Sequence, residues 1–388
     1  MNTDNIFNVQ DFGAKGDGTH DDTRTFMGAI AAADAANGGI VWVPPGKYKI
    51  TGRLEITRQV IIQGAGWNPA VDTEGSWLFM TKDYSEQEPG IVITSASSGA
   101  SGRGTMIKDL AFHHFQNNAD PGWEPIDYPF AIEIHGGSGD DVFLENIMLR
   151  DATNGIKIQT GRVNLQRIFG NPLTVGIETD NAYDVVKINN VHFWSGFWSE
   201  GPVLDWMYNN ATAIRSLKND NPHFSNIFAL GYHYGFHFGQ SASGYTSKFH
   251  LVNVDLDYCY IGLFVDGDTT TGQLCNFTSQ GADIGGRMAD YGIKVESHAS
   301  VIQGINLNIV RTRLNAVRVE ETSHLYLDNT GITDWNLAKL GYPGYEVKNI
   351  GGSITLGAGR YDVKNDPADV VYGGAPGTIS GANTTTLN

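Results

Sequence analysis

The chain has 388 residues, with 26 basic against 42 acidic side chains and a formal net charge of −16. An acidic surface repels phosphate backbones, so we expect no nucleic-acid partner. Hydrophobic residues make up 41% and charged residues 18% of the chain, which is typical of a folded protein rather than a disordered one. No run of about 18 apolar residues occurs, so we expect no membrane-spanning helix and no membrane partner.

The amino-terminal segment is predicted to form a cap. Residues 21–36 are rich in alanine, begin with Asp21 and Asp22, and stop before Gly38. Acidic residues in the first turn and glycine after the last are helix boundary signals, so we expect a helix here. Residues 40–50 follow as a strand, a proline turn and a second strand. The apolar stripe of the helix is expected to close one end of a barrel, and it consists of Phe26, Ile30 and Ala33.

From residue 109 to about residue 328, two short phrases alternate along the chain. The first is Asn or Asp, an apolar residue, any residue, and usually a second apolar one, as in residues 146–149 and 253–256. The second begins with Gly or Ala and alternates in the same way, as in residues 155–158 and 292–295. The closest copies lie 21 to 24 residues apart, a period that is typical of a solenoid.

Alternation within each phrase determines the geometry. In residues 156–158 the two isoleucines point to one side and Lys157 to the other, because side chains alternate along a strand. The copies follow one another too closely for crossover helices, so each strand is expected to stack on the same strand of the previous coil. The sequence therefore predicts an all-β, single-stranded parallel β-helix, a solenoid with an N-terminal capping helix. We expect a single domain over residues 1–388, with the cap and first strands at 1–50, coils at 51–360, and a C-terminal cap or tail at 361–388.

Three segments of the opening carry a family resemblance. They are residues 9–23 (VQDFGAKGDGTHDDT), 38–48 (GGIVWVPPGKY) and 61–66 (IIQGAG). Together they resemble the opening of pectate-lyase-superfamily proteins, a group that includes the pectate-lyase-3-type and polygalacturonase-like β-helices. The resemblance implies a right-handed parallel β-helix. It does not select a chemistry, because lyases, hydrolases, epimerases, fructotransferases and phage tailspikes resemble one another here.

The catalytic motifs of two branches of that group are missing from the sequence. The polygalacturonase order of Asn-Thr-Asp, Asp-Asp, Gly-His-Gly and Arg-Ile-Lys is not found, and Asp21 and Asp22 belong to the opening motif. The epimerase phrase Tyr-Gly-Phe-Asp-Pro-His is also absent, since residues 234–238 (YGFHF) match only its start. The resemblance therefore implies no catalytic residue at any given position.

Two long insertions between phrases are expected to wall a groove on one outer face. They cover residues 113–128 and 194–208, and the second is predicted to be a loop dense in aromatic residues. Aromatic rings stack on the apolar C–H faces of sugars, so Trp194 and Trp198 are candidates for a sugar platform. The alternative is that Phe197 and Trp206 simply seal the loop onto the coil.

Asp255 and Asp257 are the candidate catalytic residues. They lie two positions apart on one face of a strand, and carboxylates held close together push one another's pKa values apart. One carboxyl then acts as an acid and the other as a base or nucleophile, which is what glycosidic cleavage requires. Glu178 is a reserve candidate. The alternatives for the pair are two solvated carboxylates or two calcium ligands.

Other outward-facing residues are candidate substrate contacts. His237 is expected to act either as a proton carrier or as a hydrogen-bond partner of a sugar. Glu133 and Lys157 follow one another in the same column and are expected to form surface ion pairs instead. Besides the two tryptophans, the expected substrate-binding residues are His192, Tyr232, His237 and Arg215.

The two cysteines, Cys259 and Cys275, are expected to be separate thiols, because stacking the phrases does not bring them opposite each other. They are expected neither to catalyse nor to bind zinc, and no residue is assigned as a metal ligand.

These features predict a carbohydrate-active enzyme that cleaves or rearranges glycosidic bonds of a poly- or oligosaccharide by carboxylate acid–base chemistry, in the manner of a glycoside hydrolase. One alternative is a polysaccharide lyase that acts by β-elimination on a uronate polymer. The other is a non-catalytic, tailspike-like glycan-binding β-helix. No cofactor is expected to be required, with calcium an option for a lyase, and the protein is expected to be a monomer or a homotrimer. The first residues do not form a signal peptide, so we expect either an extracellular or periplasmic mature form or a protein not exported by that route.

Overall fold

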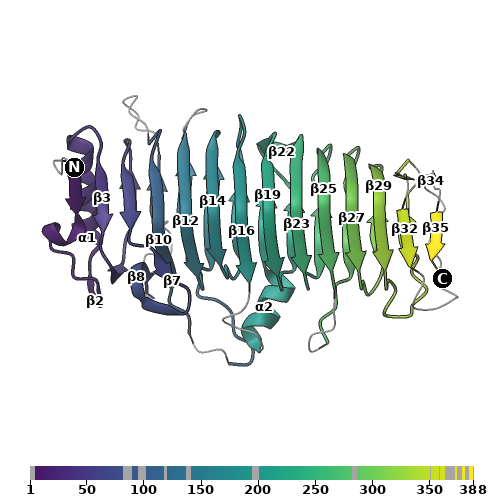
Figure 1. Ribbon diagram of the computed structural model, residues 1–388, viewed down its shortest axis with the longest axis horizontal. Coiled ribbons are helices and arrows are strands. Elements are labelled where there is room, and N and C mark those ends of the chain that lie inside the picture. The colour runs from purple at the N-terminus through teal and green to yellow at the C-terminus, as the bar shows by residue number, and fades with distance from the viewer. Residues whose placement is uncertain are drawn as a thin grey trace. The chain divides into compact units, whose positions relative to one another are not determined.

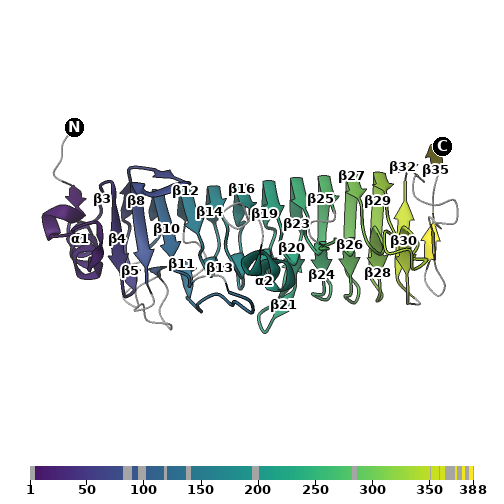
Figure 2. The same ribbon diagram turned by 90° about the horizontal axis from the view of Figure 1, so that it is seen from below.

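The computed structural model describes residues 5–81, 90–94, 102–117, 120–136, 141–194, 201–281, 286–349, 351–357, 359–362, 372–373, 378–380 and 384–387. The chain divides into two compact units, residues 1–203 and 204–388, and each consists mainly of short stacked strands (Figure 1, Figure 2). Within the described ranges, neither helix is long and apolar enough to cross a membrane.

The first unit begins with a cap and continues as two stacks of parallel strands, which we name sheet A and sheet B. The cap comprises β1 (Ile6–Asn8), a 3-10 helix (Val9–Phe12), β2 (Asp17–Asp21), α1 (Thr23–Ala35), β3 (Ile40–Val43) and β4 (Gly46–Ile50). Sheet A holds β6 (Ile61–Gly64), β8 (Val71–Met80), β10 (Met106–His114), β12 (Val142–Arg150), β14 (Val163–Gly170) and β16 (Lys187–Trp194), and β7 (Trp67–Asn68) pairs antiparallel with β8. Sheet B holds β5 (Leu54–Ile56), β9 (Ile91–Ile93), β11 (Phe130–His135), β13 (Asn154–Gln159) and β15 (Val175–Thr179).

The second unit repeats the two stacks, and Figure 1 shows the long strands of its sheet A side by side. Sheet A here holds β19 (His223–Leu230), β23 (Phe249–Asp257), β25 (Thr271–Gln280), β27 (Val301–Val310), β29 (His324–Thr333), β31 (Ser353–Leu356), β32 (Gly359–Asp362), β34 (Thr378–Ser380) and β35 (Thr384–Leu387). Sheet B holds β17 (Thr212–Ser216), β20 (Tyr234–Phe238), β24 (Ile261–Val265), β26 (Tyr291–Val295), β28 (Val317–Val319), β30 (Tyr345–Val347) and β33 (Tyr372–Gly373). The remaining elements are α2 (Pro202–Asn210), β18 (Asn219–Asp220), β21 (Gln240–Ser241) and β22 (Gly244–Ser247).

Parallel pairing in register confirms the predicted parallel β-helix in each unit. In sheet B of the first unit, Ile132 pairs with Ile156, which pairs with Ile177, and all three side chains are fully buried. The residue that follows each isoleucine points outward, so that Glu133, Lys157 and Glu178 form the expected outer column. The core of each unit is therefore a set of axial rows of like apolar side chains.

The repeated Asn or Asp of the first phrase sits where each long strand of sheet A bends. Its φ is positive, for example 56° at Asn253 and 53° at Asn276, a left-handed conformation that asparagine tolerates better than most residues. The side-chain amides also bond from coil to coil. Asn253 Nδ2 donates to Asn226 Oδ1 at 3.0 Å, and Asn276 Nδ2 donates to Asn253 Oδ1 at 2.9 Å. We call this chain of amides, which continues through Asn306 and Asn329, the asparagine ladder.

The first unit interrupts this pattern at one coil. Arg167 of β14 takes the left-handed position with φ 58°, opposite Asn146 on one side and Asn190 on the other. Asn146 Nδ2 donates to Asp109 Oδ1 at 2.6 Å, but its own buried Oδ1 has no hydrogen-bond partner among the described residues. An arginine side chain carries no amide that fits the ladder, and the Arg167 guanidinium lies over the Trp67 ring instead, 5.4 Å from its centroid.

The predicted capping helix is confirmed as α1. Phe26 and Ala33 are fully buried and Ile30 is nearly so, as expected for a stripe that closes the stack. Asp22 at the helix start does not cap the helix with its side chain. Its carboxylate instead accepts the backbone N–H groups of Lys15 at 2.7 Å and Gly16 at 3.0 Å, which fixes the opening loop.

The prediction of a loop over residues 194–208 is wrong in part, because α2 occupies Pro202–Asn210. Proline is favoured in the first turn of a helix, where its missing N–H has no partner to lose. The aromatic residues of the segment suggested a sugar-binding loop, so Pro202 was not recognised as a helix start signal. Residues 195–200, which include Phe197 and Trp198, lie outside the described residues.

The prediction of two separate thiols is confirmed. Cys259 is buried and Cys275 is partly buried, and both are free. Burial raises the pKa of the Cys259 thiol to about 12, so the thiol is not a nucleophile at neutral pH.

Candidate functional site

The carboxylate pair, Asp255 and Asp257, lies at the end of β23 in the second unit. Val254 and Leu256 alternate with the two acids and are buried, so both carboxylates point outward as the parity of the strand predicts. In register, Asp255 lies between Phe228 and Thr278, and Asp257 lies between Leu230 and Gln280.

The two carboxyl groups lie close enough to change each other's affinity for the proton. Burial, the negative charge of Asp255 and the interaction between the two carboxyl groups together raise the pKa of Asp257 to about 6. Burial also raises the pKa of Asp255, while its interaction with Asp257 opposes that rise. Below about pH 6, Asp257 therefore holds a proton.

Residues two positions apart on one face of a strand are separated by roughly 7 Å along it. The two carboxyl groups of glycosidases lie about 5–9.5 Å apart, so the placement of Asp255 and Asp257 on β23 is compatible with such a pair. The pair can therefore give and receive a proton on one face of the strand.

A second reactive group, which we call the sheet B cluster, lies on the outer face of sheet B in the second unit and comprises Tyr234, His237, Phe264, Asp266 and Lys294. His237 and Phe264 are adjacent in register, and Lys294 follows Phe264. His237 Nε2 lies 2.7 Å from Asp266 Oδ1, and only 16% of the imidazole side chain is exposed. A carboxylate on one ring nitrogen fixes the tautomer, so that the other nitrogen can act as a base.

Aromatic rings hold this imidazole in place. The Tyr234 ring stacks on the Phe264 ring with centroids 4.8 Å apart, and His237 lies 5.2 Å from each of them. Burial and the negative charge of Asp266 raise the pKa of Tyr234, so its hydroxyl keeps its proton. The ammonium of Lys294 lies 5.1 Å from the Tyr291 ring centroid and pairs with Glu296.

Helix α2 supports the base of this cluster. His233 stacks on Tyr260 with ring centroids 4.7 Å apart, and its Nδ1 lies 3.0 Å from the carbonyl oxygen of Tyr208. Asp290 is buried and pairs with Arg313 through both carboxylate oxygens. Burial, joined by the nearby Asp290 carboxylate, raises the pKa of Tyr260 to about 12. Tyr260 therefore keeps its proton at neutral pH, and burial lowers the pKa of His233.

The predicted site residues of the first unit have mixed outcomes. Glu178 is only 4% exposed, and its carboxylate lies 3.4 Å from the Lys157 ammonium, which favours an ion-pair role over catalysis. Trp194 points outward as expected, with 43% of its surface exposed. His192 packs between Phe169 and Trp194, and burial lowers its pKa. These residues belong to a different unit from the carboxylate pair.

The prediction that Tyr232 binds substrate is wrong. Its side chain is fully buried, and burial raises its pKa well above the usual value. The residue lies just before β20, where the chain turns inward, so its ring packs in the core. Arg215 and His237 are paired in register on the outer face of sheet B, as predicted.

Sequence reasoning missed the partner of His237, because Asp266 lies 29 residues further along the chain. Its position directly after the β24 strand, one coil beyond His237, was the available signal. It also missed a charged array in the first unit, where His113 Nδ1 lies 2.9 Å from Asp72 and Lys47 lies 2.7 Å from the same carboxylate. Asp72 lies in an inserted hairpin outside the repeated phrases, so the repeat does not predict that it contacts His113.

Calcium was expected as an option for a lyase. Over the part of the chain that the structure describes, no group of three or more His, Cys, Asp or Glu side chains could hold a metal ion.

Comparisons with known proteins found relatives that match part of this chain. The chain is 33% identical over 155 residues to mannuronan C5-epimerase AlgE3 of Azotobacter vinelandii, covering 37% of this chain and 8% of that protein. It is 32% identical over 156 residues to alginate lyase 7 of the same organism, covering 38% of this chain and 17% of that protein. The chain thus spans less than a fifth of the length of these relatives.

Structural similarity extends further along the chain. The A-module of mannuronan C5-epimerase AlgE4 from Azotobacter vinelandii superimposes with a TM-score of 0.58 at 17% identity, covering 98% of this chain and 100% of that module, which shows a shared fold. The family described as rhamnogalacturonase A/epimerase, pectate lyase-like, matches residues 6–199, which is half of the chain. The opening motif, the stacked coils and this match agree, and the chain belongs to the rhamnogalacturonase A/epimerase, pectate lyase-like family.

Proposed function

We propose that this protein is a carbohydrate-active enzyme that cleaves glycosidic bonds of a poly- or oligosaccharide with the carboxylate pair. The observation that carries this proposal is the placement of Asp255 and Asp257 on one outward face of β23, together with a pKa of about 6 for Asp257. Membership of a family that includes carbohydrate-active enzymes supports the substrate class.

In the proposed reaction, Asp257 donates its proton to the glycosidic oxygen as the bond from that oxygen to the anomeric carbon breaks. A water oxygen forms the new bond to the anomeric carbon, and Asp255 accepts the proton that the water loses. Transfer of this proton from Asp255 back to Asp257 returns the pair to its starting state. His237 and Arg215 remain proposed substrate contacts of the second unit. Trp194, Trp198 and His192 remain proposed sugar contacts of the first unit, and Trp198 lies outside the described residues.

The test replaces each acid by its amide. Asp257→Asn removes the proton donor and Asp255→Asn removes the acceptor, and each is expected to reduce turnover by about 10²–10⁴-fold. Gln280→Ala alters the neighbouring outward side chain without touching a carboxyl and serves as the control. The readout is the appearance of new reducing ends from a panel of polysaccharides, with circular dichroism to confirm the fold. Full activity in both acid variants would remove the assignment.

A second candidate function is favoured by the sheet B cluster, namely proton abstraction from a uronate sugar with β-elimination. His237, oriented by Asp266, would take the proton next to the uronate carboxyl group, and Tyr234 would protonate the departing oxygen. Lys294 lies on the same face and supplies positive charge near the sugar carboxylate. The names of the relatives, an alginate lyase and mannuronan epimerases, support this candidate.

The products separate the two candidates. Hydrolysis gives saturated reducing ends, whereas elimination gives a double bond between C4 and C5 that absorbs in the ultraviolet. His237→Gln and Asp266→Asn are expected to abolish the absorbing product if elimination occurs. If the sheet B cluster is not catalytic, both variants retain the activity of the parent protein.

A further inference from the structure

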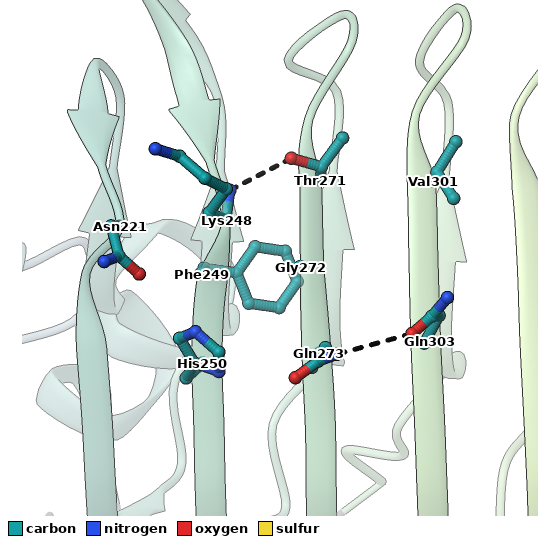
Figure 3. A pocket seen from close by; sticks show the side chains of 9 residues that line it. All are labelled: Asn221, Lys248, Phe249, His250, Thr271, Gly272, Gln273, Val301 and Gln303. Atoms are coloured by element: carbon teal, nitrogen blue, oxygen red, sulfur yellow. Dashed lines mark hydrogen bonds between the residues drawn. The ribbon is translucent and has the colours of Figure 1, made fainter.

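A shallow hollow of about 350 Å³ lies on the outer face of sheet A in the second unit. It crosses β23, β25 and β27 on the part of each strand that precedes the asparagine ladder, whereas the carboxylate pair follows the ladder (Figure 3). The hollow therefore belongs neither to the carboxylate pair nor to the sheet B cluster.

Beneath the hollow, Phe249 and Gly272 face the core. Phe249 is fully buried, and its ring lies 2.3 Å from the place where a Cβ on Gly272 would stand. The two residues pair in register, as do the buried Leu251 and Leu274 two positions on, so the side chains that face outward here are those on either side of Gly272. Figure 3 shows the Phe249 ring reaching across to Gly272.

One wall belongs to a longer row of planar polar side chains, which we call the amide row. Five successive strands contribute one member each, in register: His223, His250, Gln273, Gln303 and Tyr326. The two imidazoles lie 4.8 Å apart, and Gln273 Nε2 donates to Gln303 Oε1 at 3.4 Å. Tyr326 at the end of the row is 46% exposed and presents an aromatic ring to solvent.

The chemistry of the row suits a chain of sugar hydroxyls. A primary amide carries two N–H donors and one acceptor, and the bond between Gln273 and Gln303 uses only one of each. No Asp or Glu lines the hollow, although the chain as a whole has a net charge of −16. The charged side chain that lines it is Lys248, whose ammonium lies 2.7 Å from Asp220.

The spacing of the row supports an extended ligand. Neighbouring strands lie about 4.8 Å apart, so the row offers one polar group per coil at a distance comparable with one pyranose ring of an extended glycan. A single small molecule would contact only the hollow, whereas the row continues past it to Tyr326. An aromatic ring at the end of a polar row is an arrangement that stacks on a sugar face.

We propose that the amide row is a glycan-binding track that holds a polysaccharide chain, with the hollow at Gly272 receiving one sugar residue, and that it takes no part in the chemistry. The inference does not depend on which reaction the protein catalyses. It concerns a different part of the surface from either proposed reactive group.

The test measures binding in the Asp257→Asn background, so that the probe is not consumed by the carboxylate pair. Fluorescently labelled alginate oligosaccharides and neutral glucan oligosaccharides are titrated separately, and the arm that binds identifies the charge class of the glycan. The double variant Gln273→Ala with Gln303→Ala is expected to weaken binding about tenfold, the effect of losing roughly two hydrogen bonds. Tyr326→Ala is expected to weaken it as well.

Gln166→Ala is the matched control. Gln166 is an exposed glutamine of sheet A in the first unit, and it accepts a hydrogen bond from Asn189 Nδ2 at 2.6 Å, so it copies the amide pairing outside the track. Its binding constant is expected to stay within about twofold of the parent. The proposal of a glycan-binding track is overturned if neither probe binds, or if the double variant and the parent bind the probe with equal affinity. Neither result bears on turnover, which is measured separately with the parent protein.

Discussion

Asp255 and Asp257 lie two residues apart on one outward face of β23, and the pKa of Asp257 is raised to about 6. Burial is the largest cause of this rise and the charge of Asp255 is the next. The pair is therefore set to change its protonation within the range of physiological pH, which few carboxylates do.

The first prediction concerns the pH dependence of turnover. If Asp257 acts as the acid, activity is expected to fall above about pH 6, by roughly tenfold per pH unit, because the proton donor is lost. Asp255→Asn removes a negative charge that raises the pKa of Asp257, so the falling limb of its residual activity is expected to move to lower pH. Initial rates measured between pH 4 and 9 test both statements. A falling limb that does not move in the variant would show that another group controls it.

The second prediction concerns stability. The folded pKa of Asp257 lies near 6, above the ordinary value of 3.8, so protonation stabilises the fold. This contribution is complete below about pH 3.8 and is lost as the pH rises through about 6. Asn at position 257 cannot ionise, so Asp257→Asn is expected to gain about 1–2 kcal/mol relative to the parent between pH 4 and pH 7, after allowance for solvent screening. Urea unfolding at several pH values measures the difference, and parallel pH curves for the two proteins would contradict it.

The repeat in the sequence was sufficient to predict the architecture, because each coil repeats the same inward and outward alternation. The parity of residues 254–257 correctly places both aspartates outside and Val254 and Leu256 inside. The stripe of α1 was also predictable, since helix boundaries and apolar spacing are local signals.

Contacts between coils were harder to predict. The pairing of His237 with Asp266 joins residues 29 positions apart. The alternating pattern of a strand does not show which turn residue contacts the preceding coil. Tyr232 was assigned to the surface because it lies near His237 in sequence, yet it precedes the strand and turns into the core. Arg167 occupies a ladder position without being asparagine, so the repeated phrase was not recognised in that coil.

The third prediction tests the asparagine ladder. Asn253 has φ 56°, donates to Asn226 and accepts from Asn276, so Asn253→Ala loses two hydrogen bonds and a residue suited to the left-handed conformation. The expected loss in the free energy of unfolding is about 2–3 kcal/mol. Urea unfolding followed by circular dichroism measures it.

Asn253→Gly separates the two contributions. Glycine adopts a positive φ without strain but cannot bond to the neighbouring amides, so its loss is expected to be about 1–2 kcal/mol, smaller than that of alanine. Equal losses in the two variants would mean that the backbone conformation contributes nothing. No loss in either would mean that the amide chain does not stabilise the stack.

The last prediction concerns Gly272 and Phe249. A methyl group on Gly272 would meet the Phe249 ring at 2.3 Å, so Gly272→Ala is expected to destabilise the second unit by about 1–3 kcal/mol through overpacking. Phe249→Ala alone removes a fully buried ring and is expected to cost about 3–5 kcal/mol. In the double variant the alanine methyl at position 272 enters the space that the ring has left. The loss of stability in the double variant should therefore be smaller than the sum of the losses in the two single variants. Unfolding of all four proteins in urea gives the coupling energy. Strictly additive costs would show that the cost of Gly272→Ala does not come from the Phe249 ring.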